Sequence, residues 1–341
     1  MSIPAHGARA SILSVLLAAT VSVVGCGEGG SGEAPPVAAG DGVTRKVVAV
    51  IPKGTSHEFW KAVHAGAVKA GQDHDLEIIW KGPAVEDDRA EQIKVVEQFT
   101  TRGVDGIVIA PLDDTALVRP LQEAADEDIK VAIIDSGVQW DGGVTFAATD
   151  NRQGGVLAAR EMGRLLPKGG KVVVLRYVEG SASTTNREEG FLDTIRSEFP
   201  EIEIVTDNLY GGATLEGCVK SAENLLDRFQ AFDGAFAPCE PVTVAFMRTL
   251  DEAGRKDGTV LVGFDASESL VTGLREGKVD ALVVQDPFAM GEKGVNALVD
   301  AWAGKDVPAR LDTGCGVVTT ENMDSPESQR LLDPPLDKYL P

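Results

Sequence analysis

Runs of apolar, β-branched residues alternate with amphipathic stretches along most of the chain. The runs at Val47–Ile51, Gly106–Ala110 and Lys130–Asp135 predict strands. Between them, residues 57–71 and 87–102 place apolar side chains at spacings of three and four, which predicts helices. Continuous apolar strands separated by helices are typical of a parallel sheet that helices cover on both faces.

The same alternation restarts after Asp150. We expect further strands at Lys171–Leu175, Ile202–Val205, Gly234–Ala237, Val260–Phe264 and Ala281–Val284. We expect further helices at Gly154–Leu166, Thr185–Glu198, Glu216–Arg228, Pro241–Ala253 and Pro287–Ala303. The pattern therefore predicts an α/β fold of two doubly wound parallel-sheet units. Because no long linker separates them, we expect two lobes joined by short hinges.

Polar and aromatic residues follow the predicted strands. In open α/β sheets, ligands bind beyond the carboxyl ends of the strands, so these residues are candidates for a binding site. Sugar hydroxyls need donors and acceptors, and an aromatic ring packs on the apolar face of a sugar ring. The set favours a small polyhydroxylated ligand. Its members are Lys53, His57, Phe59, Trp60, Asp135, Ser136, Cys239, Asp265 and Gln285, with Arg187 near the start of a helix.

Each candidate also has a purely structural interpretation. Trp60 is equally explained as a core residue of the first helix, and Asp135 or Asp265 as the N-cap of the helix that follows. Lys53 fits a solvated turn, and Cys239 fits an inert small residue. The sequence leaves these alternatives open.

The N-terminus has the features of an export signal. Arg9 precedes the apolar run 10–24, which is too short for a comfortable membrane span. The quartet that ends in Cys26 resembles the lipobox of bacterial lipoproteins, in which the cysteine is acylated. Residues 27–44 are rich in Gly, Ala, Pro and Ser, which is typical of a flexible linker. We therefore expect a signal peptide at 1–25 and a lipid-anchored linker at 26–44.

The charge balance excludes nucleic acid as a partner. The chain carries 53 acidic and 32 basic residues, a formal net charge of −21, and it has no basic run. Nucleic-acid binding draws its affinity from clustered Lys and Arg, which are missing here. With 341 residues, 43% of them hydrophobic, the chain is long enough for more than one core.

The cysteines predict at most one disulfide within the mature chain. If Cys26 is lipidated, Cys218, Cys239 and Cys315 remain, and an odd number leaves at least one thiol unpaired. We expect Cys218 to pair with Cys239 if any pair forms. No Cys or His spacing indicates a metal site, so neither a metal nor a cofactor is expected.

Motifs for catalysis are absent from the sequence. It has no GxSxG elbow, no GxGxxG after a strand and no Walker A sequence. Of the four histidines, only His57 lies close to a predicted strand end, so a catalytic triad would depend on it alone. Glycosidases use a pair of carboxylates that face each other across the bond they cleave. In this sequence only the large number of carboxylates suggests such an enzyme. We expect no catalytic residue and no enzyme activity.

Six fragments, taken in order, resemble one family. They are EFW at Glu58, RGVDGIVIAPLD at Arg102, ATDNRQGG at Ala148, NREEGF at Asn186, VGFD at Val262, and Gln285 with the GEKGV that follows. Over Lys46 to Asn322 the chain resembles the type I periplasmic binding proteins of the ribose-binding kind, whose fold is shared by the effector domain of LacI-like regulators. A repressor is excluded because no DNA-binding headpiece precedes this region and an export signal does.

The resemblance implies two lobes joined by three hinge crossings, near Asp150, Gln285 and Asp312. Asp150 and Asn151 would hold a hinge and cap a helix. The implied division is 45–150 plus 286–310 for the N-terminal lobe, 151–285 plus 311–325 for the C-terminal lobe, and 326–341 for a C-terminal tail.

The resemblance also implies ligand contacts. Phe59 and Trp60 would stack on a sugar ring, and its hydroxyls would be bound by Asp135, Arg187, Asp265 and Gln285.

The chain departs from the ribose-binder pattern at four positions. Lys53 stands where a small polar residue is usual and His57 where an asparagine is, while Ser136 replaces an arginine and Cys239 an asparagine. The changes argue against ribose itself, and the added positive charge makes a sugar acid or another anionic polyol a candidate.

We therefore predict an exported, membrane-tethered and monomeric solute-binding protein in the periplasm or cell envelope. It would close its lobes around a small carbohydrate or polyol and deliver it to an ABC permease. A sensory protein that signals to a membrane kinase or chemoreceptor is an alternative, and a carbohydrate-active enzyme is a weaker one. The sequence does not identify the ligand, the membrane or the partner.

Overall fold

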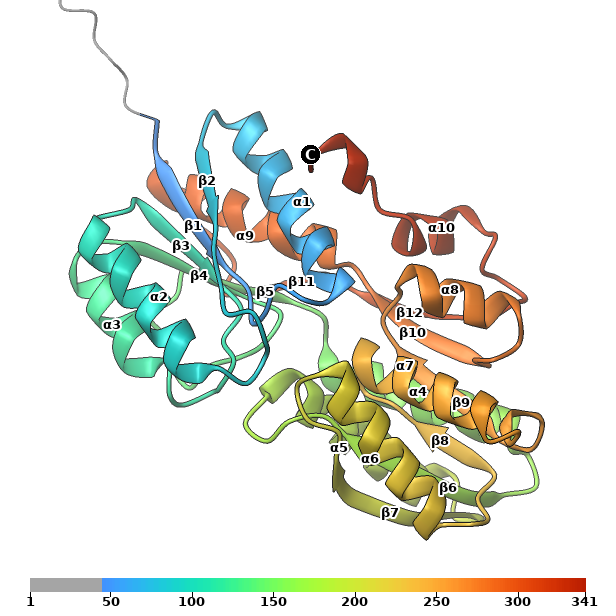
Figure 1. The fold of residues 1–341 in the computed structure, drawn as a ribbon. Coiled ribbons are helices and arrows are strands. Elements are labelled where there is room, and N and C mark those ends of the chain that lie inside the picture. The colour runs from blue at the N-terminus through green and yellow to red at the C-terminus, as the bar shows by residue number, and fades with distance from the viewer. Residues whose placement is uncertain (1–44) are drawn as a thin grey trace, which may run out of the picture. The chain divides into compact units, whose positions relative to one another are not determined.

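The computed structural model describes residues 45–341. The predicted signal peptide, the linker and Cys26 lie outside this part of the chain. Two six-stranded sheets, each covered by helices on both faces, form two lobes, which confirms the predicted fold class (Figure 1). No helix in residues 45–341 is both long enough and apolar enough to cross a bilayer.

The N-terminal lobe has the strand order β11-β5-β4-β3-β1-β2, with all neighbours parallel. Its strands are β1 (Val47–Ile51), β2 (Glu77–Trp80), β3 (Gly106–Ile109), β4 (Lys130–Ile134), β5 (Thr145–Ala148) and β11 (Arg310–Asp312). Helices α1 (Glu58–Asp73) and α9 (Pro287–Trp302) cover one face, and α2 (Arg89–Arg102) and α3 (Val118–Asp126) the other. The strands are buried on both faces because each face packs against apolar helix residues.

The C-terminal lobe has the order β12-β10-β9-β8-β6-β7, in which only β10 and β12 run antiparallel. Its strands are β6 (Gly170–Arg176), β7 (Ile202–Tyr210), β8 (Gly234–Phe236), β9 (Val260–Phe264), β10 (Ala281–Gln285) and β12 (Cys315–Val318). Helices α4 (Asn151–Leu165) and α5 (Ala182–Glu198) cover one face, and α6 (Leu215–Arg228), α7 (Glu240–Glu252) and α8 (Glu268–Arg275) the other.

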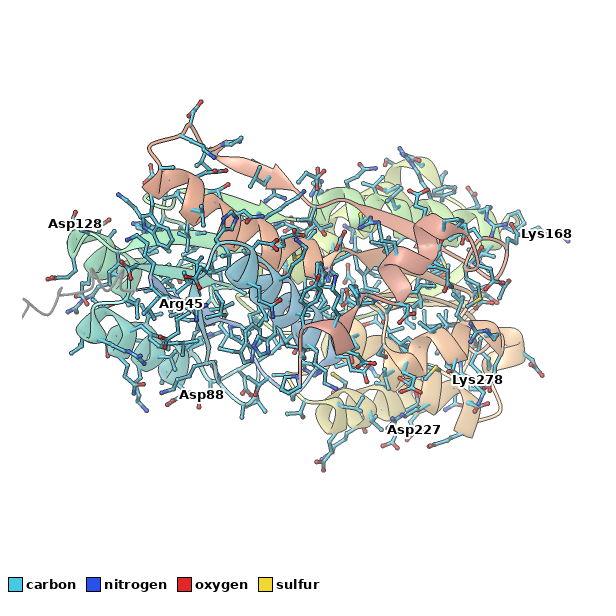
Figure 2. All side chains as sticks on the ribbon, turned by 90° about the horizontal axis from the view of Figure 1, so that it is seen from above. Arg45, Asp88, Asp128, Lys168, Asp227 and Lys278 are labelled. Carbon is cyan, nitrogen blue, oxygen red and sulfur yellow. The ribbon has the colours of Figure 1, made fainter. Side chains whose placement is uncertain are left out.

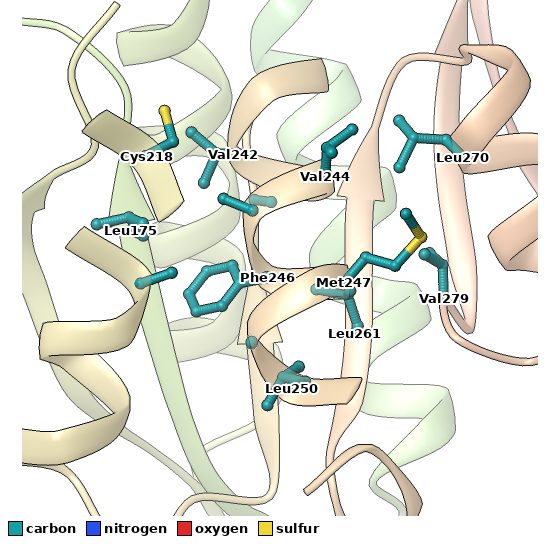
Figure 3. Packing of buried hydrophobic residues seen from close by; sticks show 14 of the residues in the cluster. Leu175, Cys218, Val242, Val244, Phe246, Met247, Leu250, Leu261, Leu270 and Val279 are labelled. Carbon is teal, nitrogen blue, oxygen red and sulfur yellow. The ribbon is translucent and has the colours of Figure 1, made fainter. Parts of the chain in front are cut away.

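The core of the C-terminal lobe is densest around α7. Phe246 and Leu250 are fully buried and pack with residues of α6, α8 and the sheet (Figure 3). By contrast, charged residues such as Asp128 and Lys168 are exposed at the periphery (Figure 2). This division of apolar and charged side chains keeps both sheets dry.

The chain passes between the two sheets three times. The crossings follow β5, β10 and β11, at residues 149–150, 286 and 313–314. Asp150 caps α4 by accepting a hydrogen bond from the Gln153 N–H, and Thr149 Oγ1 donates to Gly314 O at 3.1 Å. The first and third crossings are therefore tied to each other.

The structure adds elements that the sequence pattern did not predict. They are β2, β5, β11, β12, α3, α8 and, in the tail, α10 (Pro326–Leu332). Helices α3 and α8 have only nine and eight residues, too few periods for a pattern to stand out. The strands have three or four residues each and include polar or partly exposed positions, which interrupt the apolar run. A single-turn 3-10 helix, η2 (Leu336–Lys338), lies near the end of the chain.

The C-terminal tail contacts both lobes. Leu331 and Leu332 pack against the core of the C-terminal lobe, while η2 lies on α1 and the ring of Tyr339 lies 5.7 Å from that of Phe288. Arg330 forms an ion pair with Asp286, at the second crossing.

No disulfide joins cysteines within residues 45–341, so the pairing of Cys218 with Cys239, expected only if a pair forms, is not realised. Cys218, Cys239 and Cys315 are all free thiols. Cys218 instead packs in the core, where its thiol donates to Gly212 O at 3.3 Å, and Cys239 faces the gap between the lobes. Both side chains belong to the same core cluster, yet no bond joins them.

Candidate functional site

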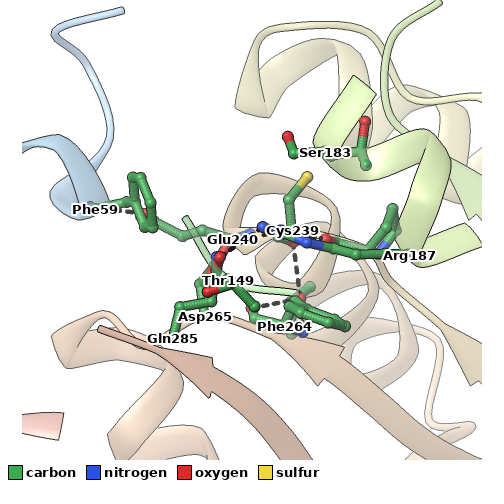
Figure 4. Close-up of polar contacts among 12 residues, drawn as sticks. Phe59, Thr149, Ser183, Arg187, Cys239, Glu240, Phe264, Asp265 and Gln285 are labelled. Atoms are coloured by element: carbon green, nitrogen blue, oxygen red, sulfur yellow. Dashed lines mark hydrogen bonds and ion pairs between the residues drawn. The ribbon is translucent and has the colours of Figure 1, made fainter. Parts of the chain in front are cut away.

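One cavity lies where the two lobes meet, with about 370 Å³ of free space counted to its open mouth. Nine of the ten sequence-predicted residues line it: Lys53, His57, Phe59, Trp60, Asp135, Arg187, Cys239, Asp265 and Gln285. Figure 4 shows several of them, with Phe59 from the N-terminal lobe facing Glu240 and Asp265 from the C-terminal lobe.

Ser136 is the residue that does not line the cavity. It is buried behind the wall, where its hydroxyl accepts a hydrogen bond from the Ser183 N–H at 3.1 Å. It thus joins the two lobes beside the site.

Asp135 and Asp265 occupy equivalent places in the two lobes. Each directly follows a strand, β4 or β9, and each has a left-handed backbone, with φ of 58° and 69°. This conformation is costly for a residue other than glycine and is frequent where function demands it. Neither residue caps the helix after it, since α8 begins with Ser267 as its N-cap.

Asp265 is held in a buried network. Its Oδ1 accepts from Gln285 Nε2 at 2.5 Å and its Oδ2 from the Glu240 N–H at 3.0 Å. Arg187 Nη1 lies 4.0 Å from Oδ2. Burial raises the pKa of Asp265 despite these favourable partners. The carboxylate therefore stabilises the start of α7 and still presents free lone pairs to the cavity.

Arg187 is positioned by contacts on three sides. Its Nε donates to Asn151 Oδ1 at 2.8 Å, Nη1 to Pro238 O at 2.9 Å and Nη2 to Gln285 Oε1 at 2.7 Å. The guanidinium stands over the Phe264 ring, 4.5 Å from its centroid. A guanidinium has five N–H groups, so two remain available to a ligand.

Lys53 is buried rather than solvated, so its interpretation as a turn lysine is wrong. Its Nζ lies 2.8 Å from Asp135 Oδ2 and donates to Ser183 Oγ at 2.9 Å and Ser181 Oγ at 3.4 Å. The serines belong to the C-terminal lobe, so Lys53 connects the lobes across the gap.

Phe59 and Trp60 stand edge to face, with ring centroids 4.9 Å apart. Trp60 is 3% exposed and belongs to the core, yet it also reaches the cavity, and its Nε1 donates to Glu86 Oε1 at 2.6 Å. Phe59 is only partly buried. Phe59 is consequently the more accessible ring for a ligand.

Six lining residues were missed from the sequence: Glu86, Tyr177, Ser183, Thr184, Glu240 and Pro241. Tyr177 directly follows β6 and Glu240 lies just after β8, so the rule of inspecting strand ends applied to both. Glu86 follows β2, a strand that the pattern did not reveal. Burial raises the pKa of Tyr177 and of the Cys239 thiol well above their ordinary values, and nearby carboxylates add to the effect.

The described residues contain no group of three or more His, Cys, Asp or Glu side chains arranged to hold a metal ion. What the cavity offers is hydrogen bonding, aromatic surface and charge.

Comparison with known proteins places these features in one family. The model of the periplasmic binding protein domain matches residues 48–306. The ribose import binding protein RbsB of Bacillus subtilis is 25% identical over 264 residues, 76% of this chain and 84% of its own. The D-ribose/D-allose-binding protein of Pseudomonas aeruginosa is 28% identical over 285 residues, 80% and 86% of the two chains.

Solved structures agree. A carbohydrate transporter solute-binding protein from Agrobacterium radiobacter, in complex with D-arabinose, superposes with a TM-score of 0.81 at 29% identity and covers 85% of this chain and 100% of its own. An ABC transporter solute-binding protein from Agrobacterium vitis with bound D-fucose has a TM-score of 0.80 at 34% identity, with 84% and 99% covered. The chain therefore belongs to the periplasmic binding protein domain family.

Proposed function

We propose that this chain is the solute-binding protein of a sugar ABC transporter and binds one small carbohydrate or polyol between its lobes. The observation that carries the proposal is that side chains from both lobes line the same cavity. A ligand held by both lobes favours the closed state, because only closure brings both sets of contacts together. The sugars bound to its structural neighbours support the same class of ligand.

Each part of the cavity has a proposed role. Phe59 and, at its edge, Trp60 pack on the apolar face of the sugar ring. Arg187 donates to hydroxyls, while Asp265 accepts from them through the lone pairs that its protein contacts leave free. Asp135 and Gln285 add hydroxyl contacts from opposite lobes.

The remaining predicted contacts shape the cavity or hold its walls in place. They are Lys53, His57, Ser136 and Cys239. The chain binds its ligand without turnover.

Export and anchoring belong to the same proposal. Residues 1–25 direct the chain across the membrane, Cys26 carries the lipid, and the closed monomer presents both lobes to a permease. Mass spectrometry of the membrane fraction should find an acylated Cys26 at the N-terminus, and Cys26→Ser should release the protein. If the protein is found outside the membrane fraction with an unmodified N-terminus, the lipid anchor is contradicted, but the sugar-binding function is not.

Ligand binding is tested with the Cys26→Ser protein in a thermal-shift screen of pentoses, hexoses, polyols, amino sugars and sugar acids. A bound ligand raises the melting temperature by mass action. We expect at least one monosaccharide or polyol to give a rise that calorimetry confirms as one site per chain. Stability unchanged by every compound would contradict the proposal. Hydrolysis of a labelled oligosaccharide by the same preparation would favour the enzyme alternative.

A further inference from the structure

Carboxylates outnumber cations on the wall of the cavity. Its lining contains four carboxylates and two fixed cations, and all six side chains are buried. They are Glu86, Asp135, Glu240 and Asp265 against Lys53 and Arg187.

Both cations are already engaged by the protein. Lys53 is neutralised by Asp135 at 2.8 Å, with two serine hydroxyls as further acceptors. Arg187 Nη1 lies 4.0 Å from Asp265 Oδ2, and the guanidinium donates three hydrogen bonds to neutral oxygens of the protein. Each cation on the wall therefore already has a carboxylate beside it, which weakens the reason for expecting a sugar acid.

Glu86 and Glu240 are the unmatched carboxylates. Within residues 45–341, neither forms an ion pair with a lysine or arginine, and His57 Nε2 lies 3.6 Å from Glu86 Oε1. Glu86 otherwise accepts from Trp60 Nε1 at 2.6 Å, and Glu240 accepts from the Phe59 N–H at 3.3 Å. Glu86 belongs to the N-terminal lobe and Glu240 to the C-terminal lobe, so both reach the cavity only when it is closed.

A buried carboxylate without a cation is unfavourable, because no attraction to a positive charge offsets the free-energy cost of removing it from water. Burial, and then the neighbouring Asp265, raise the pKa of Glu240 to about 7. In addition, His57 Nε2 is buried and has no hydrogen-bond partner in the described chain. A ligand that supplies a positive charge together with hydroxyl groups would satisfy the carboxylates and the imidazole at once.

We propose that the cavity selects a polyhydroxylated ligand that carries a protonated amine, an amino sugar or amino cyclitol, with Glu240 and Glu86 as the partners of the ammonium group. The inference rests on the proposed sugar-binding function and names its ligand class. Neutral sugars of the same shape bind more weakly, and uronic acids bind most weakly because they add a further uncompensated anion to the two unmatched carboxylates.

The test uses matched triplets of one ring configuration, for example galactose, galactosamine and galacturonic acid, with the glucose and mannose series beside them. Calorimetry at pH 6.5 should give at least tenfold tighter binding for the amine than for the neutral sugar in one or more series. Repeating it in buffers of different ionisation heat should show proton uptake when the neutral sugar binds and little or none when the amine binds, because the ammonium group keeps Glu240 ionised in the closed state.

Glu240→Gln and Glu86→Gln keep the shape of the side chain and remove its charge. Each should bring amine affinity down to that of the neutral sugar, and Glu240→Gln should abolish the proton uptake that accompanies binding of the neutral sugar. Glu223→Gln, an exposed position on α6, is the matched control and should change neither. The melting temperature of each variant checks that it folds.

The outcomes separate the two proposals. Neutral sugars that bind as tightly as their amines, or tighter, overturn the amine preference and leave the sugar-binding function intact. An amine preference that persists in both Gln variants overturns the roles of Glu86 and Glu240. Failure of every sugar and polyol to bind overturns the function and this inference with it.

Discussion

Glu240, at the start of α7 in the C-terminal lobe, accepts a hydrogen bond at 3.3 Å from the backbone N–H of Phe59 in the first turn of α1 in the N-terminal lobe. Glu58 returns the contact by accepting from the Glu268 N–H, at the start of α8, at 3.0 Å. A carboxylate near a helix N-terminus satisfies free N–H groups and the helix dipole. Each lobe thus stabilises helix starts of the other when the gap is closed.

Closure should depend on pH through Glu240. Its pKa is about 7 in the closed structure, raised from 4.5 mainly by burial that opening relieves. A group with a higher pKa in the closed state takes up a proton on closing, so closure is favoured as pH falls from about 7 toward 4.5 and disfavoured above 7. Affinity for a neutral sugar should rise roughly fifty- to a hundredfold from pH 8 to pH 5 by calorimetry.

Glu240→Gln should flatten that profile, since it cannot titrate. A profile that is as steep in the variant as in the natural protein would assign the effect to another group, with Asp265, whose pKa burial also raises, as the first to examine.

Removing the Asp265 carboxylate should weaken ligand binding. Asp265→Ala deletes an acceptor for the ligand and releases Gln285 and the start of α7. Charge-assisted hydrogen bonds are worth about 1.5 to 3 kcal/mol, so calorimetry should show affinity roughly ten- to a hundredfold lower. Asp251→Ala, which removes an exposed carboxylate paired with Lys278, is the control. Unaltered affinity in the Asp265 variant would take this residue out of the site.

Helices α1 and α9 touch through glycines, which sets how the N-terminal lobe is assembled. A Cβ at Gly66 would lie 2.0 Å from Phe288 O, a backbone atom that cannot move by itself. Gly66→Ala should lower the free energy of unfolding by about 1 to 3 kcal/mol in urea titrations. Gly258→Ala, where a Cβ meets nothing within 4 Å, should stay within about 0.5 kcal/mol of the natural protein. Equal stability of the two variants would mean that the helices shift at no cost.

The C-terminal tail should support closure, because it packs on both lobes. Deletion of residues 334–341 leaves α10 in place but removes η2 from α1 and Tyr339 from Phe288. We expect ligand affinity to drop a few-fold and the ligand-free protein to have a larger radius of gyration in solution scattering. Tyr339→Ala should produce part of the same change. If truncation changes neither the ligand affinity nor the radius of gyration, the tail does not support closure.

The sequence by itself determined the repeating layers of this protein and the places to search for its site. Long apolar strands such as Val47–Ile51 and amphipathic helices carry enough periods to be identified, and polar residues after a parallel strand must gather at one edge of a sheet. Nine of the ten residues selected in this way line one cavity.

Only the tertiary structure decided the state of each site residue. Lys53 adds a positive charge in the sequence, but in the fold Asp135 neutralises it, although the two residues are far apart along the chain. Glu86 reaches the cavity from a loop after a strand too short to predict. The electrostatic character of a buried site depends on which charges are paired at distances of a few ångströms, and pairing between distant segments is set by packing, which local sequence patterns do not contain.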